Sequence, residues 1–283
     1  MSTDPSTEDG FPAAAYLARI GLDVQPAADL EGLRLVHRAH HRAIPFEDID
    51  VFLGRLPDLS LPGLVGKLIH ARRGGYCLES NRLLNHALTA LGFEVRDLLG
   101  RVRLGGPPGA RAHHALIVHL DGADWLADVG FGGPGPLGPL PVEPGRVHEQ
   151  AGVRYRIMAE DGDGMALQRA APGGDWSDLY GWRTDEQVLA VDFDTANVIC
   201  TRSDLTPFPR HLMLSVHRAD GRTTLMNRQL SIIGPQGDQT RRIADAVTLA
   251  EVLDTQFGIV LSADDLDALM ARLLSGRAGP ATG

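Results

Sequence analysis

The apolar pattern of this 283-residue chain changes at Gly92, and this change limits the folds that the chain can adopt. Up to Leu91, apolar residues recur every three or four positions, which is typical of helices that bury one face. Beyond Gly92, short apolar runs are separated by Gly, Pro and Asp turns, which is typical of strands. Strands and then helices follow towards the C-terminus. This order predicts an α+β chain with a helical first domain, a β-rich second domain and an α/β third domain.

Local signals place the individual elements within this order. We expect helices within residues 11–43, 61–71, 77–91, 185–200, 248–257 and 263–274. We expect strands at residues 95–104, 115–120, 124–129, 153–158, 165–169, 211–218, 223–227 and 229–233. Asp29, Pro62 and Ser262 each occupy a position that is typical of a helix start. Residues 1–10 and 276–283 are expected to be loose ends.

Composition limits the partners and the compartment. The formal net charge of −9 argues against nucleic acid, because such partners need a basic face. Cys77 and Cys200 are the only cysteines, too few for a disulfide framework. The polar, acidic start differs from a secretory leader, and the apolar runs are too short for a membrane span, so we expect a cytoplasmic protein. Lys67 is the only lysine among 27 basic residues, a bias that we attribute to codon usage.

Cys77 has the local sequence of a nucleophile. Gly74 and Gly75 allow the backbone to turn sharply just before the helix that begins near Cys77. A thiol at a helix N-terminus, or beside an imidazolium, converts more readily to the reactive thiolate. We therefore predict that Cys77 is the nucleophile of a cysteine–histidine–aspartate enzyme that forms a covalent acyl intermediate.

The histidine partner of Cys77 is selected by the geometry of a hairpin. His113 and His114 precede the first of two strands that Asp121-Gly122 connects, and Asp128 lies at the end of the second. If the turn has two residues, His113 shares a sheet face with Asp128, whereas His114 points to the other face. A three-residue turn would reverse this choice. Asp128 is then expected to orient the His113 ring, which takes the proton of Cys77.

Metal binding is the competing use of Cys, His and Asp side chains. The chain contains no CxxC or HExxH motif, and Cys200 has no companion ligand nearby in the sequence. The aspartates within residues 161–164 lack the spacing of a calcium loop and predict a turn instead. We therefore expect no metal site, and we expect Cys200 to be a small buried apolar residue.

Five short segments form a combination that is specific to one protein family. They are residues 44–49 (IPFEDI), 73–81 (RGGYCLESN), 111–113 (RAH), 128–132 (DVGFG) and 206–208 (TPF). Together they resemble the arylamine N-acetyltransferases, and the match runs from the first helices into the third domain. Asp48, Leu78 and Ser80 depart from the family pattern, which bears on acceptor preference rather than on the chemistry.

The resemblance implies a fold and a reaction. The fold would be the three-domain cysteine-protease-like fold. Its parts would be a helical bundle with the nucleophile (1–92), a β-barrel with the histidine, the aspartate and a linking helix (93–200), and an α/β lid (201–283). The reaction would transfer acetyl from acetyl-CoA, a cosubstrate, through a Cys77 thioester to an arylamine or arylhydrazine in xenobiotic metabolism. Such weakly basic amines are neutral at pH 7 and attack without first losing a proton.

The resemblance also implies contacts for the two substrates. Phe46, Phe131 and Phe208 would bind the aromatic acceptor, while Gly130 and Gly132 would let CoA approach the backbone closely. Backbone N–H groups near the nucleophile would hold the developing oxyanion. The expected partners are thus CoA and a small-molecule arylamine or hydrazine, with no nucleic acid and no membrane, and a homodimer is compatible with this picture.

Three alternatives remain open at this point. The chain could be an amide synthase of the same family that acts on a polyketide chain, which would need a wider pocket. It could be a cysteine hydrolase or transglutaminase-like enzyme, which would pass the acyl group to water or to lysine. A non-enzymatic binding protein is disfavoured, because all three positions of the predicted triad are filled.

Overall fold

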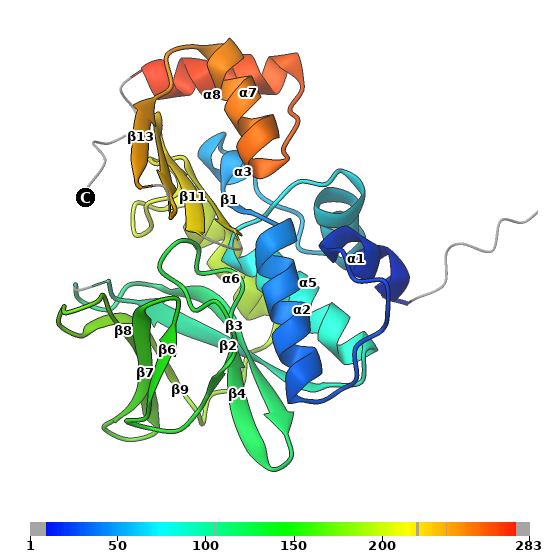
Figure 1. Cartoon of the computed structure of the whole chain (residues 1–283), viewed down its shortest axis with the longest axis vertical. Coiled ribbons are helices and arrows are strands. Elements are labelled where there is room, and N and C mark those ends of the chain that lie inside the picture. Colours follow the sequence, from blue (N-terminus) through cyan, green and yellow to red (C-terminus); the bar gives the residue numbers. More distant parts are fainter. Residues whose placement is uncertain (1–9, 105, 219–220, 236, 276–283) are drawn as a thin grey trace, which may run out of the picture.

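The computed structural model describes residues 10–104, 106–218, 221–235 and 237–275, so the predicted loose ends lie outside it except for Gly10. Its first part is helical, as the apolar pattern predicts (Figure 1). The helices are α1 (Ala13–Ile20), α2 (Leu30–Ala43), α3 (Ile49–Phe52), α4 (Leu61–Leu64), the π-helix η1 (Val65–His70) and α5 (Cys77–Ala90). The predicted cap Asp29 accepts a hydrogen bond of 2.8 Å from the N–H of Gly32.

The helix predicted at residues 61–71 changes type within its length. It begins as the α-helix α4, with Ser60 as the N-terminal cap and Pro62 in the first turn. It then widens into the π-helix η1, and the N–H of Ala71 bonds to the oxygen of Gly66, five residues earlier. Apolar periodicity does not distinguish these two helix types, so the sequence predicts only that the segment is helical.

The middle of the chain forms an antiparallel sheet of eight strands that curls into a nearly closed barrel (Figure 1). The order of the strands is β5-β4-β3-β2-β9-β8-β7-β6. Their bounds are β2 (Glu94–Val102), β3 (Arg111–Leu120), β4 (Ala123–Ala127), β5 (Leu140–Pro141), β6 (Val147–Gln150), β7 (Val153–Glu160), β8 (Gly164–Ala170) and β9 (Ser177–Arg183). Helix α6 (Ala190–Arg202) follows the barrel, as predicted.

The last part of the chain combines a second sheet with two helices. The order of this sheet is β1-β10-β11-β12-β13, and α7 (Ala246–Phe257) and α8 (Ala263–Leu274) cover it (Figure 1). The strands are β1 (Phe46–Glu47), β10 (Met213–Arg218), β11 (Gly221–Met226), β12 (Gln229–Ile233) and β13 (Gln239–Arg242). The predicted cap Ser262 accepts a hydrogen bond from the N–H of Asp265.

The sequence analysis misses several short or polar elements. Strand β13 exposes all four of its residues and therefore carries no apolar pattern. Strand β9 contains Gly181, which weakens a strand signal. Strands β1 and β5 have two residues each, and helix α3 has four, too few for a period to be read.

Three apolar clusters connect elements that are distant in the sequence. The largest joins α1, α2 and α5 to β3 and to Phe193 and Cys200 of α6. The second lies under α7 and α8 and includes Ile49 and Phe52 of α3. The third fills the barrel. Across the described residues, no helix is long and apolar enough to span a bilayer.

Candidate active site

Cys77 is the first residue of α5, and space at the preceding turn requires glycine. A side chain on Gly74 would meet the backbone oxygen of Pro45 at 2.1 Å, and one on Gly75 would meet Cβ of Glu79 at 2.7 Å. The Glu79 carboxylate accepts a hydrogen bond of 3.2 Å from the N–H of Tyr76, so it caps the helix. The sequence around Cys77 thus fixes where the helix begins.

A group of half-buried and buried charges supports this turn. Nζ of Lys67 lies 2.7 Å from Oδ2 of Asp50 and 2.8 Å from Oε1 of Glu79, while Arg73 lies 2.7 Å from Glu47. Burial raises the pKa of Glu79 to about 7, although the Lys67 ammonium opposes the shift. The only lysine of the chain therefore ties η1 to the N-terminus of α5, a role that codon usage does not explain.

The two-residue turn at Asp121-Gly122 is present, with φ of +50° and +77°. It pairs Leu116 with Ala127, so the predicted register of β3 and β4 is confirmed. Nε2 of His113 lies 2.8 Å from Oδ2 of Asp128. His114 faces the other side of the sheet and lies 2.8 Å from Asp97. The structure therefore brings together the histidine and aspartate that the hairpin argument selects.

The Asp128 carboxylate is fully buried and surrounded by hydrogen-bond donors. Besides His113, the amide of Asn81 and the N–H of Gly130 donate to Oδ1 at 2.9 Å, and the hydroxyl of Tyr180 donates to Oδ2 at 3.0 Å. Burial acts to raise the pKa of Asp128, but the charge of His113 and these hydrogen bonds outweigh it and hold the pKa below its usual range. Asp128 therefore stays ionised and orients the ring of His113.

Two histidines that the sequence analysis left unassigned contact the backbone of Asp128. The N–H of Asp128 donates to Nε2 of His37 at 3.2 Å, and Nε2 of His41 lies 3.3 Å from the backbone oxygen of Asp128. Burial, followed by the charge of His41, lowers the pKa of His37 to about 3, so this ring is neutral. Their spacing on α2 signals only one buried helix face, and the contact with Asp128 is a tertiary feature.

The thiol of Cys77 is within hydrogen-bonding reach of the His113 imidazole and lies 3.7 Å from the backbone oxygen of Ala112. Burial acts to lower the pKa of His113, but the Asp128 carboxylate and the neighbouring Cys77 raise it to about 10. Cys200 is buried as predicted, yet its sulfur lies 3.9 Å from the same oxygen of Ala112 and therefore belongs to the site.

The reactive groups open into an apolar cavity of about 710 Å³. All predicted site residues except the buried Asp128 line it, namely Phe46, Cys77, His113, Gly130, Phe131, Gly132 and Phe208. The rings of Phe46 and Phe208 are 6.3 Å apart, and the edge of His113 meets Phe131 at 4.9 Å between ring centroids. The cavity can therefore hold a planar apolar group next to the thiol.

Local structure explains why glycine occupies two positions in the 128–132 segment. A side chain on Gly130 would approach Cα of Cys77 and the amide of Asn81 at 2.7 Å, so packing against the nucleophile requires glycine there. Gly132 has φ of +79° and lies against the ring of Phe46. Packing at Gly130 and backbone conformation at Gly132 therefore account for these two glycines.

Two arginines line the cavity wall, although no sequence pattern predicts them as site residues. Arg169 of β8 and Arg222 of β11 line the cavity, and Arg222 also donates to the backbone oxygen of Gly133. Burial and then the like charge of Arg169 lower the pKa of Arg222. They are distant in sequence, and only the contact between the barrel and the second sheet brings these cations together.

The three departures from the family pattern lie outside the cavity lining. Leu78 is buried in the largest apolar cluster, and the hydroxyl of Ser80 donates to the backbone oxygen of Gly75. Asp48 accepts a hydrogen bond of 2.8 Å from the N–H of Met213, and burial raises its pKa well above the usual range. Over the described residues, no group of three Cys, His, Asp or Glu side chains is arranged to hold a metal.

Comparison with known proteins identifies the family. Residues 29–266 match the family model described as N-acetyltransferase. The chain is 36% identical over 269 residues to the arylamine N-acetyltransferase of Mycolicibacterium smegmatis, which covers 92% of this chain and 97% of that protein. This chain belongs to the arylamine N-acetyltransferase family. It is also 31% identical over 280 residues to the proansamycin X synthase of Amycolatopsis mediterranei, covering 95% of this chain and 99% of that one.

Solved structures of arylamine N-acetyltransferases share the fold. The enzyme from Salmonella typhimurium matches with a TM-score of 0.87 at 33% identity, over 94% of this chain and 99% of that one. The enzyme from Mycobacterium marinum in complex with CoA matches with a TM-score of 0.83 at 35% identity, over 92% and 98%. The predicted cysteine-protease-like fold is therefore confirmed, and the chain is an acyltransferase.

Proposed function

We propose that this chain transfers an acetyl group from acetyl-CoA to an arylamine or arylhydrazine through a thioester on Cys77. The observation that carries the proposal is that Cys77 and His113 line one apolar cavity, with the His113 ring bound to the ionised Asp128. Membership of the acetyltransferase family supports the same chemistry.

In the first half-reaction, the sulfur of Cys77 attacks the thioester carbonyl of acetyl-CoA. An imidazolium beside a thiol favours the thiolate, so His113 prepares the nucleophile. The C–S bond of acetyl-CoA breaks, and His113 supplies the proton to the departing CoA sulfur. Asp128 keeps the ring oriented and offsets its positive charge.

In the second half-reaction, the acceptor nitrogen attacks the acetyl group on Cys77. The C–N bond forms, the C–S bond to Cys77 breaks, and His113 takes the proton that the nitrogen loses. N–H groups of the first helical turn have no partner within a helix, so those at the start of α5 are suited to hold the oxyanion in both steps.

The shape of the cavity supports an aromatic acceptor. The rings of Phe46, Phe131 and Phe208 line it, and an aromatic amine that is neutral at pH 7 loses little hydration on entering. We assign Gly130 and Gly132 to the approach of CoA, because both line the cavity that also contains Cys77.

A second candidate function is amide formation within a longer chain. It is favoured by the 31% identity to proansamycin X synthase. The two functions differ in the acceptor and share the acylated cysteine. Rapid acetylation of a simple aniline or hydrazide would support the first, whereas inertness towards every simple amine in the presence of an acetylated enzyme would support the second.

Intact-mass measurement tests the covalent step directly. Mixing the protein with acetyl-CoA in the absence of an acceptor should add one acetyl group. Cys77→Ser should show no rapid addition, while the control Cys200→Ser should still be acetylated. Acetylation of Cys77→Ser at the wild-type rate would overturn the proposed mechanism.

We further propose that the three domains are residues 1–92, 93–200 and 201–283, and that the enzyme acts on xenobiotic amines in the cytoplasm. The cytoplasmic assignment is supported by the two cysteines, which are both free. Limited proteolysis would test the domain boundaries, and size-exclusion chromatography would test for a homodimer.

A further inference from the structure

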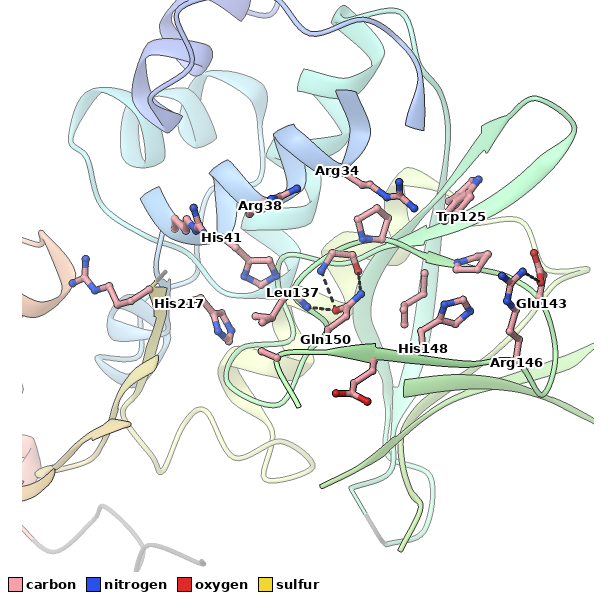
Figure 2. A pocket seen from close by; sticks show the side chains of 18 residues that line it. Arg34, Arg38, His41, Trp125, Leu137, Glu143, Arg146, His148, Gln150 and His217 are labelled. Atoms are coloured by element: carbon pink, nitrogen blue, oxygen red, sulfur yellow. Dashed lines mark hydrogen bonds and ion pairs between the residues drawn. The ribbon is translucent and has the colours of Figure 1, made fainter. Parts of the chain in front are cut away.

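A second cavity of about 610 Å³ lies beside helix α2 and shares no lining residue with the catalytic cavity among the described residues (Figure 2). The loop after Asp128 contributes to both cavities. Residues 130–134 line the catalytic cavity, whereas residues 137–141 line the second one together with parts of α2 and β6. The second cavity is therefore a separate concave site that the acetyl-transfer mechanism does not use.

Positive charge is concentrated in this second cavity. Five arginines line it, namely Arg34, Arg38, Arg42, Arg146 and Arg218. The first three are spaced by four residues and therefore share one face of α2. Two carboxylates, Glu143 and Glu149, also line the cavity. The cavity therefore has more positive than negative side chains, although the protein has a net charge of −9. Such a local excess of positive charge indicates a site for an anion.

The arginines are only partly neutralised by their neighbours. Arg34 pairs with Glu31 at 2.5 Å and Arg146 with Glu143 at 2.6 Å, both as exposed pairs that contribute little. Within the described part of the chain, Arg38 and Arg42 form no ion pair. Their guanidinium groups are thus free to bind a ligand.

Two histidines with buried, unpaired ring nitrogens also line this cavity. His217 is only 9% exposed, and its Nε2 has no hydrogen-bond partner; buried Nε2 of His148 also has none. Burial, followed by the charge of His41, lowers the pKa of His217 to about 3, so the ring is neutral. A neutral buried imidazole adds no positive charge, so the arginines supply the attraction for an anion.

Another part of the cavity wall is apolar. It is formed by Trp125 and by the segment Leu137–Pro141. The guanidinium of Arg34 lies 5.8 Å from the centroid of the Trp125 ring, and Figure 2 shows the two side chains next to each other. A planar ring can therefore pack against the wall while an attached anionic group reaches the arginines.

We infer that this cavity binds a small molecule that contains both a phosphate group and a planar ring. Phosphate fits better than a single carboxylate, because it carries more charge and matches the forked geometry of several guanidinium groups. Nucleic acid fits less well, because the positive charge is confined to a cavity instead of forming a basic face.

Two sources share this chemistry, namely the nucleotide end of CoA and an independent phosphorylated metabolite. Either ligand would lie close to the catalytic acid, because His41 lines the cavity and its Nε2 is 3.3 Å from the backbone oxygen of Asp128. The experiment below separates the two sources.

Calorimetric titration with AMP and with phenyl phosphate tests the inference. We expect at least one of them to bind, and its analogue without phosphate, adenosine or phenol, to bind at least about tenfold more weakly. Replacing Arg38 and Arg42 together by Gln should weaken binding at least about tenfold. The matched control replaces Arg241 and Arg242 by Gln, which removes the same charge from exposed positions on β13 and should have no effect.

Two further arms locate the ligand and its source. Binding should persist after Cys77 is alkylated with N-phenylmaleimide, which places a phenyl ring in the catalytic cavity. Displacement of the bound probe by CoA would assign the site to the nucleotide end of CoA. A probe that stays bound in the presence of CoA would assign the site to a separate metabolite. Absence of binding by both probes, loss of binding on alkylation, or equal weakening in the control variant would overturn the inference.

Discussion

At the scale of single residues, the site depends on which of two adjacent histidines meets Asp128. His113 and His114 are chemically identical, and each has a carboxylate at 2.8 Å, Asp128 for the first and Asp97 for the second. The two pairs differ in location, because only the first adjoins Cys77. Comparing the two carboxylates therefore isolates the effect of position from that of the hydrogen bond itself.

Asp128→Asn should slow acetylation of Cys77 by about 10³-fold or more, because an amide neither holds the correct tautomer of His113 nor stabilises its charge. Asp97→Asn is the matched control, which removes the same charge from the pair with His114 and should change the rate by less than about threefold. Stopped-flow measurement of CoA release gives both rates. Similar losses in the two variants would contradict the assignment.

Asp48 is a buried acid with an unsatisfied oxygen, so it is expected to make stability depend on pH. Its pKa is well above the usual value of about 4, so the folded chain keeps a proton that the unfolded chain loses. Stability should therefore fall as pH rises from about 4 towards the raised pKa. Asp48→Asn cannot lose a proton and should unfold a few degrees higher than the wild type at pH 7.

Thermal unfolding at pH 4, 5.5 and 7 checks this prediction. The difference between Asp48→Asn and the wild type should grow with pH. Asp238→Asn changes an exposed carboxylate that directly precedes β13. Its unfolding temperature should change with pH in parallel with that of the wild type. A constant difference for Asp48→Asn would show that the acid is ionised in the folded chain.

At the scale of elements, the turn before α5 depends on a charge that another helix supplies. Lys67 of η1 reaches Asp50 and Glu79, and Glu79 caps α5. Removing one partner of such a buried group is costly, because the remaining charges lose their compensation. Cys77 is therefore positioned by an ion pair between elements as well as by its own helix.

Lys67→Met should lower the free energy of unfolding by about 3 to 5 kcal/mol, because it removes the only ion-pair partner that the described residues give the buried Glu79 carboxylate. Arg34→Met breaks an exposed ion pair with Glu31 and should cost less than about 1 kcal/mol. Urea titration monitored by circular dichroism measures both values. Equal effects would mean that the Lys67 pairs are no stronger than a surface pair.

At the scale of the whole molecule, the helical first part and the C-terminal part of the chain share a sheet and an apolar core. Strand β1 pairs with β10, although Phe46 and Ser215 are far apart in the sequence. Ile49 and Phe52 of α3 are buried in the cluster under α7 and α8, and the guanidinium of Arg272 lies 5.0 Å from the Phe52 ring. The helical part and the C-terminal part are therefore expected to unfold together.

Phe52→Ala should lower the stability of the whole chain by about 3 to 5 kcal/mol, because it leaves a cavity in the C-terminal core. Leu56→Ala alters a side chain that is 48% exposed and should cost less than about 1 kcal/mol. Unfolding followed by tryptophan fluorescence and by far-UV circular dichroism should remain one coincident transition. Separate transitions would show that the two parts fold independently.

The sequence alone determined the local features of this protein. Helix starts at Asp29 and Ser262, the sharp turn before Cys77, and the two-residue hairpin at Asp121-Gly122 all depend on neighbouring residues, so their physics can be read from the sequence. The local turn fixes the register of the two paired strands. Because side chains alternate along each strand, this register predicts the contact between His113 and Asp128. This is why the predicted site residues come together.

The tertiary structure decided the features that depend on contacts between distant segments. The support of Asp128 by Tyr180 and His37, and the role of Lys67, arise only when separate elements pack together. The arginine-lined second cavity likewise needs α2, the 137–141 segment and β6 to be adjacent. A single sequence carries no periodic or local signal for such contacts. The separation of two residues along the chain does not show whether they are close in the folded structure.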